Sequence, residues 1–280
     1  MAGIRVVTDS ACDLPPELAE EHEIDVVPLT IRFGDQELLD RRDLTPEQFW
    51  ARCAASPRLP ETAAPAPGAF QQAYVRAAEQ GAAGVVCVAI SSALSATYQS
   101  AVTASQAVAG RIPVRVVDSR SVSIGQGLMA LTAARMAREG KALDDVAGVA
   151  EDLVARTRVF AALDTLENLK RGGRIGGAEA FLGSLLSIKP IIEVRDGVVE
   201  SESRQRTRGR SLQYLVEKVR QLGDIDNLAV MHANASDVGQ LLDLLASVYS
   251  RAQILVGQVG PVIGTHAGPG AIGVALHVPG

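Results

Sequence analysis

The chain of 280 residues is long enough for two domains with sizeable cores, although one large α/β domain is compatible with the same length. Apolar residues make up 47% and charged residues 21%, which is typical of a globular protein. The net charge of −5 and the aromatic content of 4% argue against a nucleic-acid partner, because such a surface needs excess basic residues and rings for base stacking.

The first half of the chain alternates short apolar runs with helical patterns, which indicates a parallel sheet covered by helices on both faces. The segment Ser56–Pro67 is rich in Pro and Ala, and we expect it to be an ordered crossing loop. Strands are expected at Ile4–Thr8, Ile24–Phe33, Val85–Ile90 and Val114–Val117. Helices are expected at Pro15–Glu23, Ala96–Ala109 and Ile124–Glu139. A further helix begins at Thr45, before the crossing loop, and another follows that loop and ends at Gln80.

The pattern changes after a helix expected at Leu143–Thr157. Asp196-Gly197 is typical of a two-residue hairpin turn, and it suggests a mixed sheet. We therefore predict an α/β fold of two domains: a three-layer domain with a parallel sheet (1–157) and a mixed-sheet domain (158–280), with the ligand between them. Strands are expected there at Ile188–Glu193, Val198–Glu200, Leu228–His232, Ile254–Val259 and Gly273–His277, and helices at Arg210–Leu222 and Ser236–Val248.

The cysteines and the N-terminus bear on the compartment. Cys12, Cys53 and Cys87 are far apart and form no CxxC or Cys/His spacing, so we expect neither a disulfide framework nor a zinc site. The chain enters a strand at once, which leaves no room for a signal peptide, and no apolar run reaches the roughly 18 residues of a membrane span. We expect a cytoplasmic protein whose contact with membranes is peripheral at most.

Two glycine-rich segments are similar in composition to loops that bind nucleotides or phosphate groups. Gly125–Ala130 matches the dinucleotide-binding fingerprint, but seven residues separate it from the preceding strand, so helix packing explains its glycines better. Arg171–Gly177 lacks the Lys-Ser/Thr pair of a Walker loop. It is either a helix end followed by a turn or an anion clamp built on Arg174.

Hydroxyl groups and one histidine provide further candidates. Thr62 heads a stiff Pro-rich loop, and Ser91–Thr97 lies where a strand ends and a helix begins, an edge at which α/β sheets bind ligands. Helix capping is the simpler role for those hydroxyls. His266 lies in Gly264–Gly270, which we interpret as a loop that either brings an imidazole to an anion or forms a plain surface turn.

Two surface patterns remain. Arg204, Arg206, Arg208 and Arg210 form a basic stripe, which is either a solvated edge or a docking surface for an acidic partner or phosphate. The segment Ala178–Ile188 places its apolar residues largely on one helical face. Burial in the core is the default for such a face, and a lid over an apolar ligand or a shallow membrane contact is the alternative.

Taken in order, these segments resemble the DegV family of bacterial lipid-binding proteins, and the resemblance runs almost from end to end. Where the family pattern often has Ser-Gln after the threonine, this chain has Ala63 and Ala64. The motifs that carry the resemblance are Val7–Ser10 with Asp13–Pro15, the Thr62 loop, Ser91–Tyr98, Val117–Ser119, Leu169–Ile175, Lys189-Pro190 and Gly264–Gly270.

The resemblance implies a protein that binds one long-chain fatty acid and presents it to a separate ATP-dependent kinase subunit, which forms an acyl-phosphate for phospholipid synthesis. It implies that Thr62 and a serine, Ser95 before Ser92, hold the carboxylate with His266 beside it. Arg174 and Arg206 would then serve phosphotransfer or kinase docking. It implies no metal and no cofactor besides the bound fatty acid, and transient contact with a membrane surface.

Two other classes of function are compatible with the residues. One is a self-sufficient enzyme that binds a nucleotide or phosphorylated metabolite at the sheet edge, suggested by Gly125–Ala130 and Arg174. The other is a lipid-responsive interaction protein without a kinase, suggested by the arginine stripe.

Overall fold

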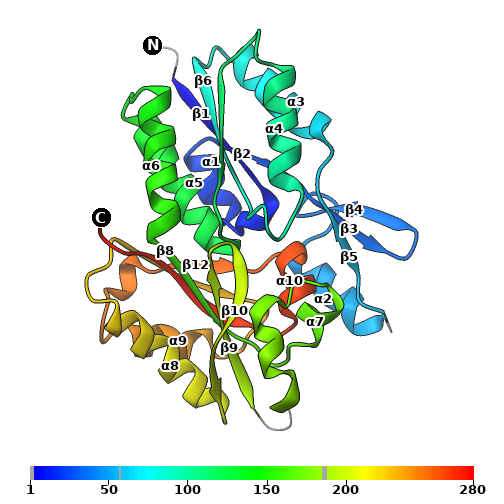
Figure 1. Cartoon of the computed structure of the whole chain (residues 1–280), viewed down its shortest axis with the longest axis vertical. Helices are drawn as coiled ribbons and strands as arrows, with labels where there is room; N and C mark the ends of the chain where they lie inside the picture. The colour runs from blue at the N-terminus through cyan, green and yellow to red at the C-terminus, as the bar shows by residue number, and fades with distance from the viewer. Residues whose placement is uncertain (1–2, 57, 185–187) are drawn as a thin grey trace.

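A four-stranded parallel sheet organises the N-terminal part of the chain (Figure 1). The computed structural model describes residues 3–56, 58–184 and 188–280. The strand order is β2-β1-β6-β7. These strands are β2 (Ile24–Val27), β1 (Ile4–Asp9), β6 (Gly84–Ala89) and β7 (Val114–Asp118).

Helices cover both faces of this sheet, as predicted. Because side chains alternate along a strand, Val85 and Cys87 of β6 pack with helices α3 (Pro67–Glu79) and α4 (Thr97–Ala107). Val86 and Val88 belong instead to the core that includes α5 (Ser123–Arg138) and α6 (Leu143–Arg156). The continuous apolar run that follows Gly84 is thus the signature of a strand that is buried on both sides.

The C-terminal part contains a six-stranded mixed sheet in the order β10-β9-β8-β13-β11-β12, which confirms the predicted fold class. Only β11 and β12 pair in parallel within it. One face packs on α8 (Arg208–Gln221) and α9 (Val238–Leu245), and the other turns towards α5. Its strands are β8 (Thr157–Ala162), β9 (Lys189–Arg195), β10 (Val198–Gln205), β11 (Asn227–His232), β12 (Leu255–Gln258) and β13 (Ile272–His277).

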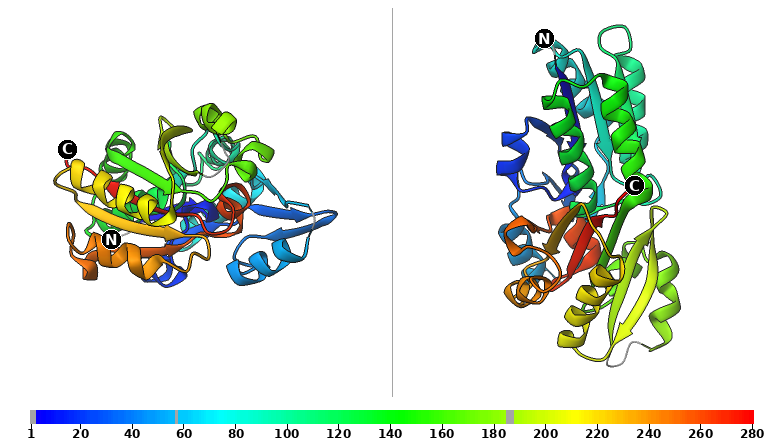
Figure 2. Two further views of the ribbon diagram at one scale, coloured as in Figure 1. Left: turned by 90° about the horizontal axis from the view of Figure 1, so that it is seen from below. Right: turned by 90° about the vertical axis from the view of Figure 1, so that its left-hand side faces the viewer.

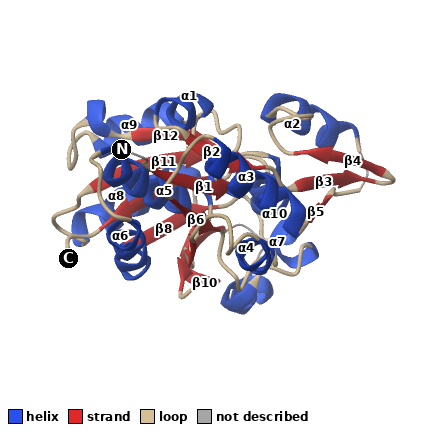
Figure 3. Ribbon diagram, turned by 90° about the horizontal axis from the view of Figure 1, so that it is seen from above, coloured by secondary structure: helices blue, strands red, loops and turns tan. Residues whose placement is uncertain are grey.

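The predicted single strand Ile24–Phe33 is wrong, because it is two strands in different sheets. Pro28 lacks the N–H that a parallel ladder needs, so β2 ends at Val27 and the next N–H, of Leu29, donates to Ser10 Oγ at 3.0 Å. The chain then forms a small antiparallel sheet of three strands that projects from the body as an arm (residues 30–56 and 58–63; Figures 2 and 3). Its elements are β3 (Thr30–Phe33), β4 (Gln36–Leu39), α2 (Pro46–Ala55) and β5 (Glu61–Ala63).

Thr62 therefore lies on a strand, since β5 pairs with β3 inside the segment that we predicted to be a loop. The loop predicted at Gly264–Gly270 is also wrong in its first half, because helix α10 spans Pro261–Ala267. A Cβ on Gly264 would lie 2.9 Å from the ring of Trp50, so this glycine allows close packing of α10 against α2. The helix ends at Ala267, and Gly268, which follows it, has a φ of +77° that only glycine adopts freely.

Several element bounds differ from the expected ones. Strand β10 continues to Gln205, because its bulge near Ser201 lets it pair with β9 along its whole length. Helices α1 (Pro16–Glu21) and α9 are shorter than predicted. The helix predicted at Ala178–Ile188 is a 3₁₀ segment over Gly176–Ser184, and its residues 185–187 lie outside the described residues. Short 3₁₀ segments also follow β1 (Ser10–Cys12) and precede β12 (Arg251–Gln253).

The glycines of Gly125–Ala130 serve helix packing, as the sequence favoured. A Cβ on Gly125 would lie 2.5 Å from Val159 Cγ2 of β8, and a Cβ on Gly127 would lie 2.6 Å from the Cys12 carbonyl oxygen. Neighbouring protein atoms thus occupy the space that a pyrophosphate would need.

The predicted domain boundary falls where α6 ends and β8 begins. Division into two domains stays a prediction, since the arm packs against α10 of the C-terminal part.

Candidate functional site

An apolar cavity of about 200 Å³ lies between the parallel sheet and the inner face of the mixed sheet. Protein cores pack densely, and a void of only about 150 Å³ already binds small apolar molecules, so a cavity of this size indicates a ligand. The apolar side chains that line it are Leu29, Ala63, Ala64, Ile90, Leu94, Ala96, Val122, Val159, Ala161, Leu163, Leu169, Ile192, Val194, Val199, Met231, Val259, Val262, Ile263, Ala267, Ala271 and Ile272.

Alternation along the strands of the mixed sheet builds one wall of this cavity. Val159 and Ala161 of β8 line it, whereas Phe160 and Ala162 pack with α8 and α9 on the opposite face. Gly273 of β13 also lines it, and a Cβ there would come within 2.4 Å of the Phe160 carbonyl oxygen. The alternation along these strands therefore decides which side chains of the mixed sheet line the cavity.

Polar side chains gather on the cavity wall near the arm. Thr62 of β5 and His266 of α10 are joined by a hydrogen bond of 2.9 Å between Oγ1 and Nε2. Arg174 lies nearby, where its Nε donates to the Leu94 carbonyl oxygen at 3.1 Å and its Nη1 to the Gly172 carbonyl oxygen at 2.7 Å. Ser95, the next residue after Leu94, lines the same cavity. The structure thus brings four of the predicted site residues to one place.

The glycine-rich turn after α7 (Glu167–Arg171) makes this cluster possible. A Cβ on Gly172 would lie 2.2 Å from His266 Nδ1, so only glycine fits beside the imidazole. Gly173 has a φ of +68°, and the turn it forms returns the chain so that Arg174 faces the cavity. Asn168 of α7 donates to the Thr265 carbonyl oxygen at 3.0 Å, which ties the turn to α10. This contact could not be predicted from the sequence, because the spacing of the two segments does not indicate that they pack together.

His266 is neutral at physiological pH. Burial, and to a smaller extent the neighbouring charge of Arg174, lowers its pKa to about 4. Its Nδ1 is buried and has no hydrogen-bond partner among the described residues. A carboxylate bound beside this ring would favour the protonated form, so the imidazole is suited to taking up a proton when an anion enters.

This shift predicts how His266 affects stability. In the unfolded chain the imidazole binds a proton below pH 6.5, but in the folded chain it does so only near pH 4, so stability is lost as the pH falls between these values. We expect His266→Gln to gain about 2 kcal/mol relative to the wild type between pH 7 and pH 4.5. Urea unfolding of both proteins across that range measures the difference, and the more exposed His22→Gln serves as control. An unchanged difference would contradict the burial of a neutral imidazole.

The polar cluster also lines a second, more polar depression on its outer side. Thr62, Arg174 and His266 are shared by both spaces, and the outer one adds Arg58 and Arg171. These residues therefore separate an apolar interior from an outer hollow that carries guanidinium groups.

Ser92 and Arg206 lie elsewhere. Ser92 is exposed and its hydroxyl donates to Asp118 at 2.5 Å, so it lines neither space. Arg206 is exposed after β10 and also lines neither. The arginine stripe is not one surface, because Arg204 stacks on Phe181 and Arg208 pairs with Asp237.

Ser123 is a cavity residue that the sequence reasoning did not single out. It begins α5, and its hydroxyl donates to Asp13 Oδ2 at 2.6 Å. Among the described residues, no group of three or more His, Cys, Asp or Glu side chains is arranged to hold a metal ion. None of the described helices is both long enough and apolar enough to span a bilayer.

Fold and cavity together define a class: an α/β protein with a parallel and a mixed sheet around an apolar cavity that has a polar cluster in its wall. The family model described as "Uncharacterised protein, DegV family" matches residues 3–278. The chain belongs to the DegV family.

Relatives and solved structures agree with this assignment over the full length. A DegV domain-containing protein of Streptomyces coelicolor is 37% identical over 277 residues, covering 98% of both chains. A fatty-acid-binding DegV family protein of Thermus thermophilus superimposes with a TM-score of 0.91 at 34% identity, covering 99% of this chain and 100% of that one. A stearic-acid-binding protein of Eubacterium ventriosum has a TM-score of 0.86 at 28% identity, with 99% and 98% covered.

Proposed function

We propose that this protein binds one long-chain fatty acid, with the acyl chain in the apolar cavity and the carboxylate at Thr62, Ser95 and His266. The observation that carries the proposal is the apolar cavity with its polar cluster in the wall. The similar structures from T. thermophilus and E. ventriosum, which bind fatty acids, support it.

The chemistry of the cavity fits an amphipathic anion. Each methylene group that leaves water for the cavity contributes about 0.8 kcal/mol, so a long acyl chain binds strongly without polar contacts. A carboxylate cannot be buried unpaired, and the hydroxyls of Thr62 and Ser95 with the imidazole of His266 supply donors for it. The lining apolar side chains supply no partner for a sugar, base or phosphate group.

We further propose that the protein presents this carboxylate to a separate ATP-dependent kinase subunit. Phosphoryl transfer adds negative charge at the carboxylate, which Arg174 is placed to stabilise beside the ligand site. The outer hollow with Arg58 and Arg171 offers a route by which the phosphoryl group reaches it. Arg206, exposed and away from the cavity, is proposed to contact the kinase rather than the ligand.

The setting follows from this role. We place the protein in the cytoplasm, with transient contact at the membrane surface where an acyl-phosphate is consumed. The three cysteines are free, and two of them are buried, which is compatible with a reducing compartment. A self-sufficient enzyme for nucleotides receives less support, because the glycines of Gly125–Ala130 pack against protein atoms.

Native mass spectrometry of the purified protein tests the binding step. We expect a mass increment that matches one long-chain fatty acid, and uptake of palmitate or oleate after the protein has been stripped of lipid. Absence of both would overturn the proposal. Calorimetric titration with NAD and ATP is the matched control, in which no binding is expected.

The kinase step needs its own experiment. A cognate kinase subunit with ATP should form acyl-phosphate only when the lipid-loaded protein is present. Fatty acid binding without any such reaction would leave a lipid-binding protein that acts through another partner.

A further inference from the structure

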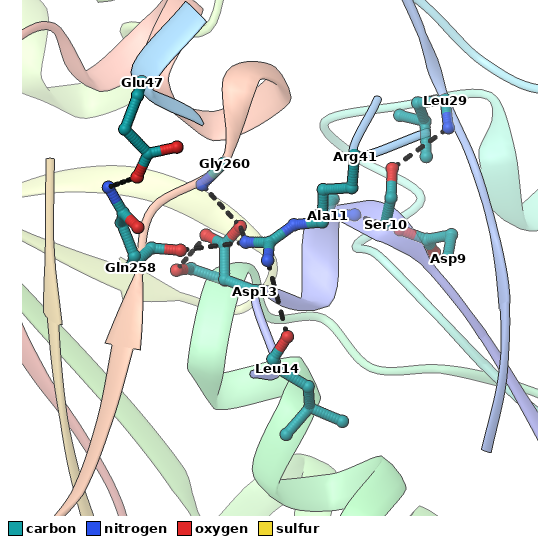
Figure 4. A network of polar contacts seen from close by, with 11 residues as sticks. Asp9, Ser10, Ala11, Asp13, Leu14, Leu29, Arg41, Glu47, Gln258 and Gly260 are labelled. Carbon is teal, nitrogen blue, oxygen red and sulfur yellow. Dashed lines mark hydrogen bonds and ion pairs between the residues drawn. The ribbon is translucent and has the colours of Figure 1, made fainter. Parts of the chain in front are cut away.

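A buried ion pair lies where the arm, the N-terminal sheet and helix α10 meet (Figure 4). Asp13 has no exposed side-chain surface and Arg41 is 18% exposed, and Arg41 Nη2 lies 3.0 Å from Asp13 Oδ1. Removing two charges from water costs free energy that only close pairing and further hydrogen bonds offset. The partners of these two side chains therefore show what the pair holds together.

Asp13 anchors the start of the helix that carries His266. Its Oδ1 also accepts the backbone N–H of Gly260, the residue before α10, at 2.8 Å, and its Oδ2 accepts the hydroxyl of Ser123. A carboxylate at this point satisfies an N–H that has no partner within the helix and favours the positive end of the helix dipole. The position of the start of α10 therefore depends on the carboxyl group of Asp13.

Arg41 belongs to the arm, which carries Thr62. It follows β4, and its Nη2 donates to the Gln258 carbonyl oxygen at 2.8 Å as well as to Asp13. Gln258 ends β12 and leads into α10, and its amide donates to Glu47 of the arm at 3.1 Å. One guanidinium group therefore links the arm to the segment that begins α10 (Figure 4).

We propose that Asp13 and Arg41 are positioning residues that hold α10 against the arm, so that His266 stays within hydrogen-bond distance of Thr62. Apolar packing of Val262 with Ile31 and Phe49 also holds the arm against α10, and the hydrogen bond from Gln258 to Glu47 adds to it. Apolar packing is non-directional, whereas a bridging guanidinium fixes distance and angle.

The backbone conformation at both residues of the ion pair is unusual. Asp13 and Arg41 have φ values of 52° and 60°, in the left-handed region that residues other than glycine rarely adopt. Asp9, Asp40, Cys12 and Glu47 are further titratable groups that interact with the pair. Three of them are carboxyl groups, so the positive charge of Arg41 offsets their mutual repulsion.

The test uses three variants: Asp13→Asn, Arg41→Lys and the matched control Glu202→Gln. Glu202 is 11% exposed and pairs with Lys218 of α8, on the face of the mixed sheet opposite the cavity. Three quantities are measured for each: the pKa of His266 from its imidazole NMR signals in lipid-free protein, the affinity for a fluorescent fatty acid, and thermal stability. The first measurement needs no ligand, so it tests the positioning even if the proposed fatty acid function fails.

We expect Asp13→Asn to raise the pKa of His266 towards its ordinary value as α10 loosens, and to weaken fatty acid binding about tenfold, the loss of one charge-assisted hydrogen bond. Arg41→Lys keeps the charge but cannot reach both acceptors, so a smaller shift in the same direction is expected; it also keeps the test decisive if Asp13→Asn does not fold. Glu202→Gln should lose stability with an unchanged His266 pKa. An unchanged His266 pKa in Asp13→Asn and Arg41→Lys, or an equal shift in Glu202→Gln, would overturn the proposal.

Discussion

A leucine in place of Ala161 is expected to abolish fatty acid binding while leaving the folded protein at least as stable as the wild type. Ala161 lies on β8 and faces the cavity of about 200 Å³. The added side chain occupies the space that the acyl chain needs. It also fills a void and buries new apolar surface, so we expect a gain of about 0.5–2 kcal/mol in the unfolding free energy of lipid-free protein.

The neighbouring position supplies the matched control. Ala162 is fully buried and belongs to the core that the mixed sheet forms with α8 and α9. The same substitution there forces a side chain into filled space and should cost about 1–3 kcal/mol without closing the cavity. Denaturant unfolding of stripped proteins and titration with a fluorescent fatty acid measure both effects. Full binding by Ala161→Leu would show that the acyl chain lies elsewhere.

The fold class was predictable because its signals are local and periodic. Runs such as the one after Gly84 are apolar at every position, which only a strand covered on both faces explains. The hairpin at Asp196-Gly197 was predictable for a similar reason, since both residues have positive φ there. Pairing partners are not predictable from local patterns, so the apolar run Ile24–Phe33 predicts one strand although the chain turns at Pro28 and its second half joins another sheet.

The candidate site was predictable only in part. The residue types at Thr62, Ser95, Arg174 and His266 pointed to an anion, and the structure gathers them. The helix that carries His266 was not predicted. The glycine at position 264 is typical of a loop, but in the structure it allows α10 to pack closely against Trp50. Contacts between distant segments, such as Asn168 with Thr265, leave no periodic trace in a sequence.

Removal of the Thr62 hydroxyl is expected to weaken fatty acid binding by about ten- to a hundredfold in a protein that still folds. Thr62→Val keeps the shape of the side chain but leaves His266 Nε2 without its partner and the carboxylate without a donor. A hydrogen bond to a charged group contributes about 1.5–3 kcal/mol, which corresponds to that loss of affinity. Strand β5 keeps its backbone pairing with β3, so the protein should stay folded, while the unpaired Nε2 is expected to lower the unfolding free energy by about 1–3 kcal/mol.

Two serines sharpen this experiment, because they lie three residues apart in one loop and only one lines the cavity. Ser95→Ala should weaken binding in the same sense as Thr62→Val, whereas Ser92→Ala should leave the affinity unchanged, since that hydroxyl is bonded to Asp118 on the surface. Titration of all three lipid-free variants with the same fluorescent fatty acid gives the comparison. A loss confined to Ser92→Ala would move the carboxylate to the sheet edge and out of the cluster. A loss shared by Thr62→Val and Ser95→Ala, combined with a rise in the His266 pKa on binding, would place the anion between the arm and α10, where the wall of an apolar cavity becomes polar.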